Sequence, residues 1–225
     1  RYQGVQFGYT SAGRYTSWND IWSYPGYKER DILPGDYKYE DWNGDGELNG
    51  QDEHPFAFDQ TPWLQFSLTA GLQWKNLEFN MLLQGSALGS MEYKEPLHEI
   101  WGKNGGGALT QFLDRWHPVD PKADPYDPST VWTSGHYAYT GRWAKNNSAF
   151  NRVSTAYLRL KSIELGYTFP KLKQIPNASL RIYANAYNLL TFTGVKFVDP
   201  EHPDDDLGRM YPLNKTYTLG VSLSF

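Results

Sequence analysis

Hydrophobic and polar residues alternate strictly along several long stretches of this chain. In residues 63–74, WLQFSLTAGLQW, an apolar side chain occupies every second position from Leu64 to Trp74, and polar or small residues lie between. Residues 77–86 resume the alternation after the dipeptide Lys75-Asn76. Because successive side chains of a strand point to opposite faces, the two stretches predict a long hairpin with one apolar face.

Three further stretches carry this alternation and predict strands at 153–169, 179–189 and 214–225. Within 153–169 the apolar positions change phase, so that the first half and the second half of the strand would present opposite faces. A β-bulge near Lys161-Ser162 accounts for this change.

The predicted connections differ in length. Those after Trp74 and Phe169 are short, whereas 87–152 and 190–213 are long. Since consecutive strands of such a meander are antiparallel, all long loops emerge on one side, as is typical of outer-membrane barrels. We therefore expect a loop region, 1–62, followed by a strand region, 63–225.

Strand length separates two all-β architectures. A soluble β-sandwich also has strands with one apolar and one polar face. The runs here exceed the about 5–6 residues of an ordinary globular strand and match the about 9–11 residues that cross a bilayer. Aromatic residues at the strand ends suit the girdles of a membrane barrel. These are Trp63, Trp74, Tyr167, Phe169, Tyr217 and Phe225.

The pattern therefore favours the C-terminal strands of a large transmembrane β-barrel. Five strands cannot close a wide barrel, and the first would leave its backbone groups unpaired in lipid. We therefore expect the chain to be part of a longer protein. The alternative from a different class is a secreted, calcium-stabilised β-sandwich that binds carbohydrate.

Composition excludes several other classes of function. Aromatic residues make up 16% of the chain and 21 residues are Gly, which favours strands and turns. The net charge of −4 provides no basic surface for nucleic acid, and the absence of Cys excludes thiol chemistry. Neither a histidine pair at metal-ligand spacing nor a catalytic set of Ser, His and carboxylate can be identified. We expect a protein that is not an enzyme.

Residues 41–52, DWNGDGELNGQD, have the spacing of an EF-hand calcium loop, with Gly46 at the sharp turn. Pro34 and Pro55 argue against the flanking helices of an EF-hand. The predicted ligands of a weakly held structural Ca²⁺ are Asp41, Asn43, Asp45, Glu47 through its backbone carbonyl, Asn49 and Asp52. The alternative is a pair of glycine turns with a solvated acidic surface.

Five segments, taken in order, carry a family resemblance. They are GDYKYEDWNGDGELNGQDE (35–53), GLQWKNLEFNMLLQGSALG (71–89), YLRLKSIELGYTFP (157–170), LRIYANAYNLLTFTG (180–194) and YPLNKTYTLGVSLSF (211–225). Together they resemble the C-terminal part of SusC/RagA-type TonB-dependent transporters of the Bacteroidota outer membrane.

The resemblance implies a 22-stranded barrel in the outer membrane of a Gram-negative bacterium, with a plug domain N-terminal to these residues. It implies import of oligosaccharides or peptides with energy from TonB, which acts through the N-terminal part, and pairing with a SusD-like surface lipoprotein. Phe225, after an alternating strand, resembles the signal read by the barrel assembly machinery. The apolar face would contact outer-membrane lipid.

Two sets of side chains are candidates for ligand contact. In the long loops, the indole rings could stack on a sugar, or pack within the loops or against the lipoprotein; they are Trp101, Trp116, Trp132 and Trp143. On the polar side of the strands, five residues are expected to face a lumen, where they would meet substrate or plug. They are Arg159, Arg181, Tyr183, Asn185 and Tyr187. The acidic segment 199–206 would be a solvated loop or a second cation site.

Overall fold

The computed structural model describes residues 4–25, 32–98, 108–139, 147–170, 178–203 and 207–225. Its contacts divide the chain into two compact units. Unit 1 comprises Arg1–Gln60, Ser90–Val153 and Asp204–Arg209, and unit 2 comprises Thr61–Gly89, Ser154–Pro203 and Met210–Phe225. Each unit is described by itself.

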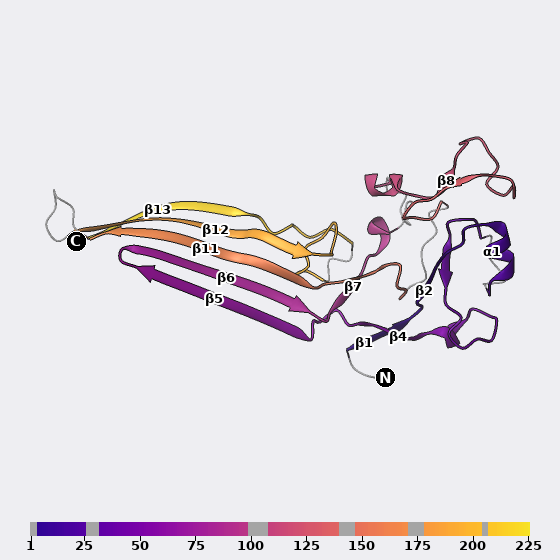
Figure 1. The fold of residues 1–225 in the computed structure, drawn as a ribbon, viewed down its shortest axis with the longest axis horizontal. Helices are drawn as coiled ribbons and strands as arrows, with labels where there is room; N and C mark the ends of the chain where they lie inside the picture. Colours follow the sequence, from indigo (N-terminus) through magenta and orange to yellow (C-terminus); the bar gives the residue numbers. More distant parts are fainter. Residues whose placement is uncertain (1–3, 26–31, 99–107, 140–146, 171–177, 204–206) are drawn as a thin grey trace. The chain divides into compact units, whose positions relative to one another are not determined.

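Unit 2 is built on one antiparallel sheet of five long strands, which run side by side in Figure 1. The order across the sheet is β13-β12-β11-β6-β5. The strands are β5 (Leu64–Trp74), β6 (Leu77–Ala87), β11 (Tyr157–Phe169), β12 (Ser179–Thr193) and β13 (Thr216–Ser224). Sequence neighbours are thus also neighbours in the sheet, as a meander requires.

The hairpin of β5 and β6 turns at Lys75-Asn76, where Lys75 adopts a positive φ of 55°. The bulge predicted near Lys161-Ser162 is confirmed, because the pairing of β11 with both neighbours shifts register between Leu160 and Ser162. Opposite this shift, Asn188 in β12 has a φ of 53°. The extra residue in β11 at this point keeps its apolar side chains on one face along the whole strand.

Two predicted strand limits differ from the structure by more than two residues. Residues 153–169 do not form one strand, because β10 (Arg152–Ser154) pairs with β7 (Ser90–Glu92) and only β11 joins the five-stranded sheet. β12 continues past the predicted end at 189 to Thr193, and Leu190 and Phe192 keep the phase of Ile182 and Ala184. Asn188 and Leu189 interrupt the alternation of polar and apolar residues, which hid this continuation in the sequence.

The Tyr183 ring on the polar face packs over a glycine of the neighbouring strand. It pairs with Gly166 on β11 and with Gly220 on β13. A Cβ added at Gly220 would collide with the Tyr183 ring, so the ring lies over the space that glycine leaves. The Arg181 guanidinium stands 4.9 Å from the centre of the same ring.

Unit 1 contains short elements where the sequence predicted loops. β1 (Val5–Gly8) pairs with β4 (His54–Phe58), β2 (Ser11–Arg14) with β3 (Tyr37–Tyr39), and β8 (His117–Pro118) with β9 (Trp132–Thr133). One α-helix, α1 (Trp18–Ser23), begins at Ser17, whose side chain accepts a hydrogen bond from Asp20 N. Three 3₁₀ turns complete the described elements: η1 (Gly50–Asp52), η2 (Glu95–Leu97) and η3 (Thr110–Leu113).

Aromatic rings form the small core of unit 1. Tyr9, Tyr39 and Leu48 are buried together, and Phe150 packs against them with its ring 5.6 Å from that of Tyr39. Edge-to-face contacts of this kind add to the burial of apolar area. None of the described helices is both long enough and apolar enough to cross a membrane.

Candidate functional site: the two faces of the five-stranded sheet

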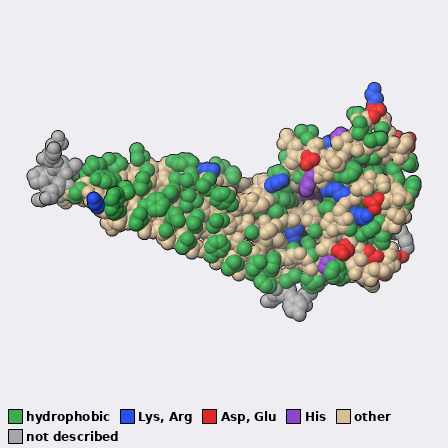
Figure 2. Space-filling model, in the orientation of Figure 1, with side chains coloured by type: hydrophobic (Ala, Val, Ile, Leu, Met, Phe, Trp, Pro, Cys, Tyr) green, Lys and Arg blue, Asp and Glu red, His purple; other side chains and the backbone are tan. Residues whose placement is uncertain are grey.

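One face of the five-stranded sheet presents apolar side chains to its surroundings. Leu219 is 76% exposed and Val221 is 65% exposed, although both lie in the middle of β13. Figure 2 shows hydrophobic side chains gathered over the sheet. The cross-strand register places the exposed members on the same side: Leu64, Phe66, Leu68, Leu72, Trp74, Leu158, Leu165, Tyr167, Phe169, Ile182, Leu190, Phe192, Tyr217, Leu219, Val221 and Leu223. We call this surface the apolar face.

An apolar surface of this extent is foreign to a water-soluble monomer, whose largest apolar patch covers only a few hundred Å². The sandwich alternative would bury such residues against a second sheet. Here they are exposed on every strand except the partly covered β6. The apolar face therefore requires an apolar environment.

The opposite, polar face holds buried and half-buried charges. Arg159 of β11 is 1% exposed. Its Nη2 donates to both carboxylate oxygens of Asp199 at 2.8 Å, its Nε donates to Thr191 Oγ1 at 2.9 Å, and its Nη1 donates to Glu201. This guanidinium thus satisfies two carboxylates that belong to residues 194–203, the segment following β12, which we call the strap.

Two more side chains of β11 hold the same strap. Lys161 Nζ donates to Glu201 at 3.0 Å and 3.1 Å, and the Tyr157 hydroxyl donates to Glu201 Oε1 at 2.9 Å. The Asp199 carboxylate also accepts from the backbone N–H of Glu201. Asp199 and Glu201 are therefore engaged with cations of the chain itself, which corrects the expectation of a solvated loop or cation site there. Residues 204–206 lie outside the described residues.

A second ion group crosses three strands of the polar face. Arg181 Nη2 on β12 donates to Glu78 Oε2 on β6 at 3.0 Å and to Glu164 Oε1 on β11 at 2.7 Å. All three side chains stay about one third exposed. Ion pairs of this exposure each add little to the free energy of folding. Their main effects are to favour this register of the three strands and to place charged groups on the polar face.

The five residues predicted to face a lumen share the polar face by register. Arg181, Tyr183, Asn185 and Tyr187 alternate along β12, and Arg159 pairs with Gln84 of the neighbouring β6. Their accessibility differs sharply: Tyr187 is exposed, whereas the strap covers Arg159. Contact of these five residues with a lumen stays a prediction. The partners of Arg159 in the structure are the carboxylates of the strap.

The calcium-like loop is closed by its own hydrogen bonds. Asp41 accepts from the backbone N–H of Gly44 and Gly46 at 2.8 Å each, and Asp45 accepts from Glu47 N, which is the chief cause that lowers the Asp45 pKa. Asn43 and Asn49 accept from Asp45 N and Gln51 N.

Asp52 differs from the other predicted ligands because it is buried at 0% exposure. Its carboxylate accepts from the backbone N–H groups of Trp42, Asn43 and Asn49. No group of three His, Cys, Asp or Glu that could hold a metal ion occurs in the described part of the chain. A carboxylate oxygen that accepts one N–H still has a second lone pair that could bind a cation. The hydrogen bonds of the loop therefore do not decide for or against Ca²⁺, and Ca²⁺ binding stays a prediction.

The tryptophans predicted to stack on a ligand are not exposed where they are described. Trp116 and Trp132 are half-buried, and the Trp132 ring contacts Tyr139 edge-on at 5.3 Å. Trp101 and Trp143 lie outside the described residues. The half-buried pair packs within unit 1.

Sequence reasoning missed the exposed indole of Trp42. It is 57% exposed and stacks on His54 with ring centres 3.7 Å apart and an interplanar angle of 14°. Its place between Asp41 and Asn43, two polar residues of a tight loop, was the available signal.

The chain has relatives among curated proteins and solved structures, although no family model matches it. It is 26% identical over 211 residues to TonB-dependent receptor P3 of Formosa agariphila, covering 87% of this chain and 19% of that protein. It is 27% identical over 206 residues to TonB-dependent receptor P26 of the same organism, covering 85% of this chain and 20% of that protein. The chain thus spans about a fifth of the length of these relatives.

The structural likeness covers almost the whole chain. The structure of a RagAB peptide transporter matches at a TM-score of 0.62 and 20% identity, over 98% of this chain and 22% of that chain. The RagAB peptide importer in a closed-closed state matches at a TM-score of 0.60 and 19% identity, over 98% and 23%. Likeness at this identity concerns the fold. The chain is thus similar in sequence to two TonB-dependent receptors of Formosa agariphila, and its fold resembles that of a segment of a RagAB transporter.

Proposed function

We propose that this chain is part of a TonB-dependent transporter in the outer membrane of a Gram-negative bacterium. Its five long strands form a segment of the wall of a larger β-barrel, with the apolar face toward lipid and the polar face toward the lumen. The observation that carries this proposal is the exposure of apolar side chains across the sheet, while Arg159 is buried on the other side.

The sheet edges support a larger barrel. Within the described residues, β5 and β13 each have a strand partner on one side only. Backbone N–H and C=O groups must be paired in hydrocarbon, so further strands would have to complete the wall. Twenty-two strands and a C-terminal position for this segment follow from the family resemblance.

The transported cargo is a nutrient, either an oligosaccharide or a peptide, and a SusD-like surface lipoprotein is the partner at the outer mouth. The RagAB structures that this fold resembles are named as peptide transporters, which supports a peptide. TonB would act through another part of the protein, and Phe225, which follows β13 and is exposed, would be read by the barrel assembly machinery. We propose no catalytic activity.

Gel mobility and membrane partition test this function. The intact protein, purified from the outer-membrane fraction in detergent, should run differently in dodecyl sulfate gels before and after boiling, because a closed barrel resists the detergent. Co-purification with a surface lipoprotein should accompany this behaviour. A protein that stays soluble without detergent and shows one mobility would instead be the secreted sandwich.

We propose Ca²⁺ as a structural ion of the 41–52 loop. The spacing of the loop and the exposed side chains of Asn43 and Asp45 support it. Because the Asp52 carboxylate already accepts hydrogen bonds from backbone N–H groups, we expect weak binding. A thermal melt of the intact protein should shift upward only at about 10⁻⁴–10⁻³ M Ca²⁺ and return with chelator. An unchanged midpoint at 10 times that concentration would leave the loop as a metal-free turn.

A further inference from the structure

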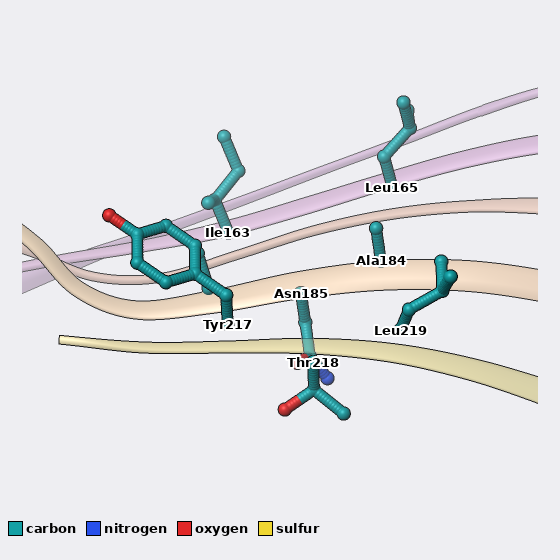
Figure 3. Close-up of a pocket in the computed structure, with 8 residues that line it drawn as sticks. Ile163, Leu165, Ala184, Asn185, Tyr217, Thr218 and Leu219 are labelled. Atoms are coloured by element: carbon teal, nitrogen blue, oxygen red, sulfur yellow. The ribbon is translucent and has the colours of Figure 1, made fainter.

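The two faces of β11 can bind different kinds of chemical group. On the apolar face, Ile163 and Leu165 line an open groove and offer only hydrocarbon (Figure 3). On the polar face, Tyr157, Arg159 and Lys161 occupy alternate positions and all donate hydrogen bonds to the strap. A hydroxyl, a guanidinium and an ammonium in one row are donors suited to an anion. We call these three side chains the donor row.

The donor row is filled by carboxylates of the chain itself. Nη2 of Arg159 donates to both carboxylate oxygens of Asp199 at 2.8 Å, and hydrogen bonds between such charged partners are the strong kind. Glu201 accepts from all three members of the row. Only Pro200 separates Asp199 from Glu201 in the sequence. The row therefore accepts two carboxylates at the spacing of near neighbours in a polypeptide.

Ion pairs are not the most stabilising way to hold the strap against the sheet. Buried charges lose their hydration, and well-packed apolar side chains of similar volume often stabilise a fold equally or better. What the ion pairs add is a contact that another carboxylate can take over, because it presents the same acceptor oxygens. Exchange can begin at one end of the row, since the Lys161 side chain stays 32% exposed.

We propose that the donor row is a binding site for the carboxylates of an acidic peptide, and that the strap fills this site until such a peptide displaces it. The strap is thus an internal competitor for the cargo. The spacing of Asp199 and Glu201 favours a peptide over a neutral sugar, whose hydroxyl groups carry no charge to replace theirs. This site rests on the proposed function, because the peptide must reach the polar face as cargo in the lumen.

Calorimetric titration of the intact protein in detergent with two peptides tests this site. Tetraglutamate with blocked ends carries carboxylates at the required spacing, and tetraglutamine with blocked ends is its neutral control. The strap variant Asp199→Asn/Glu201→Gln removes the internal competitor. It should bind tetraglutamate about tenfold more tightly than the wild type does, the gain for a site that the strap leaves free for about a tenth of the time. Tetraglutamine should bind neither protein.

Two further variants separate binding at the donor row from general attraction between charges. Asp120→Asn/Asp124→Asn changes the net charge by the same amount in unit 1, where both carboxylates are exposed and accept from the backbone N–H groups of Lys122 and Tyr126. This control should bind tetraglutamate as the wild type does. Arg159→Met, added to the strap variant, removes the guanidinium and should abolish the gain.

Unchanged or weaker binding of tetraglutamate by the strap variant would overturn the site, as would an equal gain in the unit 1 control. An equal gain for tetragalacturonate, an oligosaccharide with the same number of carboxylates, would reject a peptide as the ligand. If the strap variant loses the heat-dependent gel mobility of the wild type, Glu201→Gln alone should give a smaller gain in the same direction. A wild type that is soluble without detergent rejects the proposed function, whatever the strap variant binds.

Discussion

The two units of this chain place apolar and charged residues in opposite ways. In the sheet of unit 2, Leu219 is exposed while Arg159 is buried. In unit 1, Leu33 and Phe112 are buried while Asp45 is exposed. Unit 1 follows the rule for a protein in water, and unit 2 inverts it. The mean hydropathy of −0.65 averages the two and therefore reports neither.

The units also stabilise buried charge by different means. Arg159 in unit 2 is matched by two carboxylates from a segment 40 to 42 residues away. Asp52 in unit 1 is matched by three backbone N–H groups of its own loop. Long-range ion pairs connect a strap to a sheet, whereas local backbone donors close a turn. Substitution of Arg159 should therefore release a distant segment, whereas substitution of Asp52 should loosen only its own loop.

The largest effect is expected for Arg159→Met. The change leaves Asp199 without its bidentate partner and Glu201 with only Lys161 and Tyr157, and breaking a buried pair in this way costs about 3–5 kcal/mol. Hydrogen exchange of the intact protein in detergent should show faster exchange of the strap amides at 194–203. The sheet amides of β12 should change less.

Arg181→Met is the matched control for that change. It also removes an arginine from two carboxylates of the polar face, but its partners are about one third exposed and water replaces the lost contact. Equal loosening in both variants would show that the strap does not depend on the Arg159 contacts.

A charge on the apolar face should have the next largest effect. Leu68→Lys places an ammonium in the middle of β5, and such a change costs about 2–4 kcal/mol at the midplane of a bilayer. On a water-exposed strand the same change would cost within about 0.5 kcal/mol. Refolding into lipid vesicles measures the difference, and Thr69→Lys on the polar face of the same strand serves as the control. Equal stability of the two variants would contradict a lipid-facing surface.

Much of the sheet could be predicted because strand periodicity is local. Alternation from Leu64 to Trp74 specified the faces, and the phase change at Lys161 specified a bulge. The strap could not be predicted, since nothing in the sequence around Asp199 indicates that Arg159 is its partner. Such pairs depend on how distant segments meet. For the same reason the half-burial of Trp116 and the burial of Asp52 could not be inferred from the loop sequences.

Asp52→Ala should weaken unit 1 by a smaller amount. It leaves the N–H groups of Trp42, Asn43 and Asn49 without their acceptor, and unpaired buried donors cost about 1–3 kcal/mol. Faster amide exchange of these residues and cleavage within 41–52 by a dilute protease are the expected readouts. Asp45→Ala, at an exposed position of the same loop, should leave both nearly unchanged. Equal exchange and cleavage in the two variants would mean that the buried hydrogen bonds of Asp52 do not stabilise the loop.

The smallest effect concerns Asp20 and Lys38 in unit 1. Lys38 Nζ donates to Asp20 Oδ1 at 2.6 Å, and this hydrogen bond is the chief cause that lowers the Asp20 pKa. A carboxyl whose folded pKa is depressed contributes stability that is present above its unfolded pKa, about 3.9, and is lost as the pH falls through the folded value. Lys38→Met should therefore destabilise unit 1 at pH 7 by at most about 1 kcal/mol.

That difference should shrink as the pH falls below about 3.9, without vanishing. Lys38 also stands 3.9 Å from the centre of the Tyr24 ring, and this contact with a cation persists in acid because the ammonium stays charged. Thermal melts of the wild type and of Lys38→Met at pH 7 and at about pH 3 would separate the two contributions. Lys38→Arg keeps both the charge and the ring contact, so it should follow the wild type. A gap independent of pH would assign the whole effect to Tyr24 and none to Asp20.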